Sequence, residues 1–225
     1  MTNQGDVNEY LKPGFYIDSD SPEVFEFVHK HAQGDAPKEK AVSLFLAVRD
    51  GIRYDPYNII FKPEEFKASV RMKKSAGYCV HKAIALTAAL RAVGIPARLA
   101  LADVRNHLNT KRLKEMMKTD IFYYHGITEV FLDGRWLKVT PTFNLELCEN
   151  FGVMPLEFDG SSDCILNLYD IQGNKHMEYV NFHGSYFDVP YEMLVSEYLR
   201  LYPSMFTSEG SIRKGNFSQE AVEKD

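Results

Sequence analysis

The stretch Gly77-Tyr78-Cys79-Val80-His81-Lys82-Ala83, continuing through Leu90 to Gly94-Ile95-Pro96, decides the fold of this chain. Residues 79–93 contain neither glycine nor proline, and their few polar side chains do not collect on one helical face. A helix that is apolar almost all round is usually buried. Gly94, followed by Pro96, is typical of a helix end. The stretch therefore predicts a buried central helix that begins at Cys79.

Cys79 stands at the predicted start of this helix. The unpaired N–H groups and the positive dipole end of a helix N-terminus favour a thiolate over a thiol, and they can donate hydrogen bonds to an oxyanion. A free cysteine is also among the most buried residue types, so a small apolar core residue is the alternative interpretation. The helix by itself favours this alternative, and the case for a nucleophile depends on residues downstream.

The composition favours a folded protein with a substantial core. The chain has 225 residues, of which 45% are hydrophobic and 13% aromatic, which predicts one domain over residues 1–225. The net charge of −5, with mixed signs, argues against a nucleic-acid partner. No run of eighteen apolar residues and no signal peptide is visible, so we expect no membrane partner. The three cysteines are too few and too scattered for a disulfide framework, which fits a reducing compartment, so a cytoplasmic protein is predicted.

The order of the expected elements indicates an α+β fold. Before the central helix we expect helices over 22–33, 37–51 and 63–70, a short strand over 52–57 and a loop over 71–77. After it we expect a strand over 97–104, a polar insertion over 105–120 with one or two helical turns, and a hairpin. Beyond residue 145 the signal is weaker: strands over 163–168 and 176–182, a helix over 190–201 and a frayed tail from Ser208 to Asp225. Helices followed by an antiparallel sheet are typical of α+β proteins.

The hairpin has a predictable register because Asp133-Gly134 is a strong two-residue turn signal. Leu132 then faces Arg135, the aromatic residues Phe131 and Trp136 are opposite each other, and so are the oppositely charged Glu129 and Lys138. Extending this register places His125 on one face with three polar side chains: Thr140, Thr142 and Asn144.

Such surroundings suit a histidine base, because a partner on one ring nitrogen fixes the tautomer and leaves the other nitrogen for a nucleophile. An ordinary strand histidine is the alternative for His125. For Thr140 and Asn144 the alternative is turn chemistry after a strand. A thiol at the start of a buried helix and a histidine on a following strand can together make a thiolate–imidazolium pair.

The segments GYCVHKAIALTAALRAVGIPARLA (77–100) and HGITEVFLDGRWLKVTPT (125–142) resemble the core of the transglutaminase-like superfamily. The resemblance covers about residues 40–145, which leaves N-terminal helices and a C-terminal extension over 146–225. It implies a papain-like core in which the central helix carries the cysteine and packs on an antiparallel sheet. By this resemblance Cys79 is the nucleophile and His125 the general base. Tyr54, in the segment IRYDP, matches a frequent feature upstream of the cysteine, and we expect Tyr54 and Tyr78 to bind substrate.

One position departs from the family. Where the family usually has an aspartate as the third catalytic residue, this chain has Thr140, in the segment TPTFN (140–144). A hydroxyl can accept the imidazole N–H, but it cannot stabilise an imidazolium as a carboxylate does. Asn144 is the alternative orienting residue, as asparagine is in papain-like enzymes.

These residues predict thiol-dependent acyl transfer or hydrolysis on a peptide or carboxamide substrate, with a peptide or protein as partner. The Thr140 departure motivates the alternative, a binding module that keeps the fold with weakened catalysis. No P-loop or Rossmann pattern is present, so no cofactor is expected. Cys79 and His81 lack a second ligand pair, so no metal is expected either. Hydrolysis versus amine transfer, and the oligomeric state, stay open.

Overall fold

A computed structural model describes residues 7–207, 211–212 and 215–222 of the chain. Its helices are α1 (Pro22–His31), α2 (Pro37–Gly51), α3 (Ala68–Met72), α4 (Cys79–Ala92), α5 (Lys111–Met117), α6 (Leu145–Phe151), α7 (Tyr191–Leu201) and α8 (Phe217–Val222), with 3-10 helices at Val7–Leu11 and Pro63–Phe66. Its strands are β1 (Arg53–Tyr54), β2 (Ala76–Gly77), β3 (Ala97–Asn106), β4 (Ile121–Leu132), β5 (Arg135–Val139) and β6 (Met177–Tyr186). The predicted α+β class, with a cysteine-bearing central helix on an antiparallel sheet, is confirmed.

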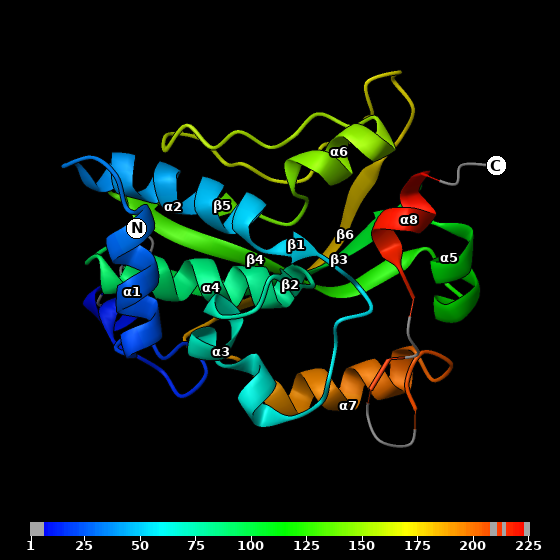
Figure 1. The fold of residues 1–225 in the computed structure, drawn as a ribbon, viewed down its shortest axis with the longest axis horizontal. Helices are drawn as coiled ribbons and strands as arrows, with labels where there is room; N and C mark the ends of the chain where they lie inside the picture. The colour runs from blue at the N-terminus through cyan, green and yellow to red at the C-terminus, as the bar shows by residue number, and fades with distance from the viewer. Residues whose placement is uncertain (1–6, 208–210, 213–214, 223–225) are drawn as a thin grey trace.

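Helix α4 is the centre of the molecule, as its sequence predicts. It packs on β3 and β4, and α1, α2 and α3 contact it as well (Figure 1). Every residue from Cys79 to Arg91 is buried. The helix ends as expected, because Gly94 adopts a φ of 78° that a glycine tolerates without strain.

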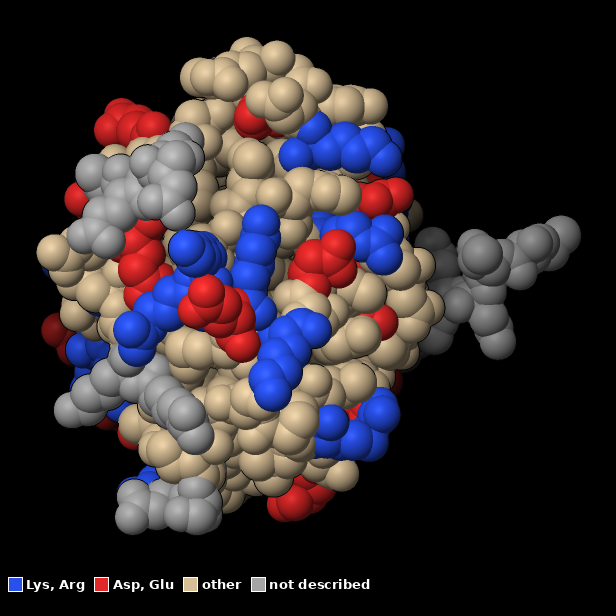
Figure 2. Space-filling model, turned by 90° about the vertical axis from the view of Figure 1, so that its right-hand side faces the viewer, with Lys and Arg blue, Asp and Glu red and all other residues tan. Residues whose placement is uncertain are grey.

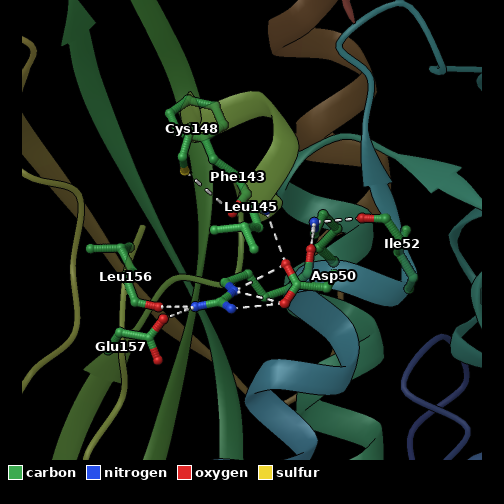
Figure 3. Close-up of polar contacts among 9 residues, drawn as sticks. Asp50, Ile52, Phe143, Leu145, Cys148, Leu156 and Glu157 are labelled. Atoms are coloured by element: carbon green, nitrogen blue, oxygen red, sulfur yellow. Dashed lines mark hydrogen bonds and ion pairs between the residues drawn. The ribbon is translucent and has the colours of Figure 1, made fainter. Parts of the chain in front are cut away.

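The polar side chains of α4 are buried because each finds a partner on a neighbouring segment. The ammonium of Lys82 donates to the carbonyl oxygens of Arg49 (2.8 Å) and Ile52 (2.5 Å), at the end of α2 (Figure 3). The last carbonyls of a helix lack partners within the helix, so Lys82 caps α2. Burial lowers the pKa of Lys82 to about 7. At the other end of α4, the guanidinium of Arg91 donates to three carbonyl oxygens: Ala97, Lys12 and Phe187.

The main sheet has four antiparallel strands in the order β5-β4-β3-β6. The predicted hairpin register is confirmed, with Leu132 opposite Arg135 and Glu129 opposite Lys138. Asp133 and Gly134 have φ values of 50° and 79°, as a turn of type I′ requires. The β4–β5 pairing ends at Thr128 opposite Val139, so the segment after Val139 leaves the hairpin.

Three local predictions were wrong. The helix expected over 63–70 is divided at Lys67 into a 3-10 helix and α3. The loop expected over 71–77 contains β2, which pairs in parallel with β1. The strand expected over 163–168 is reduced to a single bridge between Cys164 and Val139, because the backbone of this segment pairs with the end of β5 only at Cys164.

The C-terminal part of the chain returns to the core (Figure 1). Strand β6 lies beside β3, and α7 contacts β4. The frayed tail expected from Ser208 contains α8, whose Phe217 ring lies 5.5 Å from that of Tyr54; residues 208–210, 213–214 and 223–225 lie outside the described part. The carboxylate of Glu220 accepts hydrogen bonds from Tyr57 and Thr110. These tertiary contacts stabilise α8, which has no strong signal in the sequence.

On the face of the molecule formed by α5 and α8, lysine and arginine alternate with aspartate and glutamate (Figure 2). A cleft of about 600 Å³ lies there, lined by polar and apolar residues of the 107–110 segment, of α5, of the end of α6, of the 170–174 turn and of α8. In the described part of the chain, no helix is both long and apolar enough to cross a membrane.

Candidate active site

Cys79 is the first residue of α4, and its side chain lies against β4 at Gly126. A Cβ atom at Gly126 would lie 2.6 Å from Cα of Val80 and 3.0 Å from the carbonyl oxygen of Cys79. Only glycine allows the strand to approach the helix this closely. The backbone N–H groups of Gly126 and Val80 lie near the sulfur of Cys79 and act to lower the pKa of the thiol. The thiol is therefore held among backbone donors, next to the residue that follows His125.

Burial governs the charge of both candidate catalytic groups. Cys79 is 6% exposed, and desolvation raises its pKa to about 11 although the surrounding N–H groups lower it. His125 is 4% exposed, and desolvation lowers its pKa to about 3. At neutral pH this closed arrangement thus favours a neutral thiol and a neutral imidazole. It does not favour the preformed ion pair expected from the sequence.

A small apolar cavity of about 40 Å³ adjoins the thiol. It is lined by residues from four separate parts of the chain: Tyr54, Pro56 and Ile59; Tyr78 and Cys79; Leu113, Met117, Phe122 and Tyr123; and Tyr198, Tyr202, Met205 and Phe206. None of these lining residues carries a charged side chain. The predicted substrate-binding residues Tyr54 and Tyr78 both lie in this lining.

The C-terminal segment closes this cavity through two tyrosines. The hydroxyl of Tyr198 donates to the carbonyl oxygen of Tyr124 (3.2 Å). The hydroxyl of Tyr202 accepts from the N–H of Tyr123 (2.6 Å) and donates to the carbonyl oxygen of Ile121 (3.0 Å). Sequence reasoning missed both tyrosines. Tyr198 is on α7 and Tyr202 directly follows it, and a spacing of four residues does not show that their side covers Cys79.

His125 faces a second, smaller cavity of about 10 Å³, which Thr142 also lines. Tyr54 and Phe122 line both cavities, so the two cavities are neighbours. Nε2 of His125 and Oγ1 of Thr142 have no hydrogen-bond partner in the described part of the chain. A volume of this size is close to that of one water molecule, which such polar groups would hold.

Thr140 and Asn144, the candidates for the third role, differ in their surroundings. Thr140 is fully buried beside the hydroxyl of Tyr179, and its Oγ1 makes no hydrogen bond of normal geometry with described residues. Asn144 uses its Oδ1 to accept the N–H of Tyr54 (3.1 Å). The next residue, Leu145, donates its N–H to Asp50 (3.0 Å), which fixes the start of α6 (Figure 3). Asn144 therefore joins β1 to α6, and its role toward His125 stays a prediction.

The described residues include no group of three His, Cys, Asp or Glu side chains that could hold a metal ion. The arrangement provides a nucleophile, a nearby imidazole and backbone donors. These are the parts that covalent acyl chemistry requires.

Comparisons with known proteins identify the fold family. A family model described as the transglutaminase-like superfamily matches residues 26–141. Among solved structures, the chain is similar to a protein from Cytophaga hutchinsonii provisionally named a cysteine protease, with 16% sequence identity and a TM-score of 0.47. The match covers 82% of this chain and 57% of that one, so this chain spans little more than half of its length. No curated protein matches the chain.

Proposed function

Because this chain belongs to the transglutaminase-like superfamily, we propose that it catalyses acyl transfer or hydrolysis through a thioester formed on Cys79. The position of the thiol supports this most strongly. Its sulfur lies at the N-terminus of a buried helix, beside the backbone N–H groups of Gly126 and Val80. The same donors suit a developing oxyanion.

The reaction starts from the neutral pair. The sulfur of Cys79 attacks the carbonyl carbon of the substrate while His125 accepts the thiol proton. The carbonyl oxygen takes the negative charge and is stabilised by backbone N–H groups near Cys79. When the C–N bond breaks, His125 returns the proton to the departing amine, and the acyl group remains on sulfur as a thioester. Water or a second amine then attacks the thioester and regenerates the thiol.

The substrate that we propose is a peptide or protein carboxamide whose reactive part carries no charge. The lining of the Cys79 cavity supports this, because it consists of tyrosine rings and apolar side chains. A cavity of about 40 Å³ has no room for a peptide segment. Binding therefore requires the covering residues Tyr198 and Tyr202 to move away from β4.

The alternative function is a binding module with weakened catalysis. Two observations favour it: Thr140 stands where the family usually has a carboxylate, and the closed cavity keeps both Cys79 and His125 neutral. The two functions differ in whether His125 controls the reactivity of the thiol.

Alkylation of Cys79 by iodoacetamide, followed from pH 5 to 10 by peptide-resolved mass spectrometry, tests the proposal. Peptide resolution is needed because Cys148 and Cys164 are also free thiols. At pH 7 we expect His125→Ala to slow alkylation of Cys79 roughly 100-fold, which is the lower end of what a general base contributes.

The control is His176→Ala, which removes another buried histidine, whose pKa burial lowers to about 4. It should leave the alkylation rate unchanged. A rate that rises only at alkaline pH, and is the same with and without His125, would establish the binding module instead.

A further inference from the structure

Asp103 lies at an irregular point of the sheet, where both neighbours of β3 carry an extra residue. On the β4 side, Ala102 pairs with His125 but Val104 pairs with Phe122, so Tyr123 and Tyr124 together face Asp103. On the β6 side, Leu101 pairs with Gly184 and Ala102 with Phe182, so His183 is an extra residue, and a second shift between Asp103 and Val104 makes Val180 another. Such β-bulges bend a strand and re-aim the side chains beside them.

Tyr124, which directly precedes His125, has a backbone conformation that large residues rarely adopt. Its φ is 54°, in the left-handed region. For a residue other than glycine this conformation is disfavoured roughly tenfold in population. It persists only where the surrounding contacts enforce it.

The contacts of Tyr124 come from three elements. Its N–H donates to Oδ1 of Asp103 (3.1 Å) on β3. Its ring stacks on that of His183 on β6, with centroids 4.1 Å apart and an interplanar angle of 21°. From α7, Tyr198 donates to its carbonyl oxygen, and Glu197 accepts from its hydroxyl (3.3 Å).

Asp103 connects the two bulges. The oxygen that accepts the Tyr124 N–H also lies 2.7 Å from Nε2 of His183. The imidazole is thereby held flat against the ring of Tyr124. Asp103 itself is 7% exposed, so water competes little for its carboxylate.

The bulge in β4 decides to which face of the sheet the side chain of His125 points. Because the side chains of a strand alternate, a one-residue change in register moves a residue to the opposite face. With the bulge, Phe122 and His125 line the same cavity although three positions separate them.

We propose that Asp103 and His183 are positioning residues for His125: they hold Tyr124 in its left-handed conformation and thereby direct the imidazole into the cavity that Phe122 and Thr142 line, next to the cavity of Cys79. This inference rests on the proposed function for the role of His125, but the geometry that it concerns can be measured independently.

The test uses the full chain and two readouts: the ring ¹H–¹³C NMR signal of His125, assigned by its loss in His125→Ala, and the rate of Cys79 alkylation at pH 7. We expect Asp103→Ala to move the His125 signal and to slow alkylation roughly tenfold, in line with the population that Tyr124 loses. Asp103→Asn keeps an acceptor for the Tyr124 N–H and should have a smaller effect.

The deciding variant is Asp103→Ala combined with Tyr124→Gly. Glycine adopts a positive φ without help, so the double variant should recover both the His125 signal and the alkylation rate. The inference would be overturned if the double variant recovered neither the His125 signal nor the alkylation rate. It would also be overturned if Asp103→Ala left the His125 signal unmoved.

The matched control is Asp163→Ala, which removes a similar carboxylate bond to a backbone N–H, that of Lys138 (2.9 Å), away from Tyr124. It should change neither readout. If His125→Ala leaves alkylation unchanged, the proposed function fails, while the NMR signal still decides the positioning role. If Asp103→Ala does not fold, Asp103→Asn alone and with Tyr124→Gly provides the same comparison.

Discussion

At the scale of single residues, the chemistry of Cys79 depends on two opposing effects. The backbone N–H groups at the start of α4 favour a thiolate, whereas burial favours the neutral thiol and raises the pKa to about 11. Among the described residues, none acts on Cys79 with a positive charge that would reverse this, and burial also keeps His125 neutral. A carboxylate beside the imidazole would stabilise the charged form of His125 and thereby favour the thiolate of Cys79. Position 140 is where the family usually has this carboxylate.

We therefore predict that Thr140→Asp increases the reactivity of Cys79. Thr140 lies beside Tyr179, whose ring is 6.3 Å from that of His125, so Tyr179 connects position 140 with the surroundings of the imidazole. A nearby negative charge raises the pKa of a histidine by one unit or more. Alkylation of Cys79 at pH 7 should become about tenfold faster than in wild type.

Thr140→Asn is the control, since it has the shape of aspartate without the charge. Equal rates in the two variants would show that a charge at position 140 does not change the pKa of His125. A lower melting temperature is expected for both variants, and the larger decrease for Thr140→Asp, because burying a carboxylate costs more than burying an amide.

At the scale of elements, the site depends on how closely β4 approaches α4. Gly126 makes this approach possible, and the Cβ of alanine would come within 2.6 Å of backbone atoms that belong to the start of the helix. We predict that Gly126→Ala destabilises the protein by about 1–3 kcal/mol or more, because relieving the clash requires the backbone of β4 or of α4 to shift. The N–H of residue 126 should also move away from the sulfur of Cys79.

Urea unfolding and the alkylation rate of Cys79 measure the two consequences. Gly51→Ala is the matched control, because no atom lies within 4 Å of the added Cβ. It should be neutral or slightly stabilising. If Gly126→Ala behaves like Gly51→Ala, the close approach of β4 to α4 is not needed.

At the scale of the whole molecule, burial couples stability to pH. The pKa values of His125 and His176 fall to about 3 and about 4, and that of His81 falls well below 6.5, all mainly because these residues are buried. Folding thus keeps these histidines neutral, whereas in the unfolded chain they bind protons below about pH 6.5.

The free energy of unfolding should therefore decrease as the pH falls from about 6.5 toward 5, since the unfolded state binds more protons in this range. Each histidine contributes a slope of up to about 1.4 kcal/mol per pH unit. Urea unfolding at pH 7.5, 6.5 and 5.5 measures this decrease. His176→Gln should make it shallower, and an unchanged slope would show that His176 also titrates normally in the folded protein.

The amino-acid sequence alone determined the parts of this protein that depend on local pattern. The all-round apolar stretch after Cys79 predicts burial of α4, and Asp133-Gly134 predicts the hairpin and its register. These signals suffice because helix burial and turn geometry depend on residues that are close together in the sequence. They also placed Cys79 and His125 correctly at the start of α4 and on β4.

Only the tertiary structure decided what surrounds these two residues. It brought Tyr198 and Tyr202 over the thiol, used Asn144 to bind Tyr54, and set Asp103 between two bulges. It also gave α6 and α8 their helical form through contacts with distant segments. The physical reason is that desolvation sets the charge of Cys79 and His125. Desolvation results from contacts between segments far apart in the chain, so it cannot be predicted from a local sequence pattern.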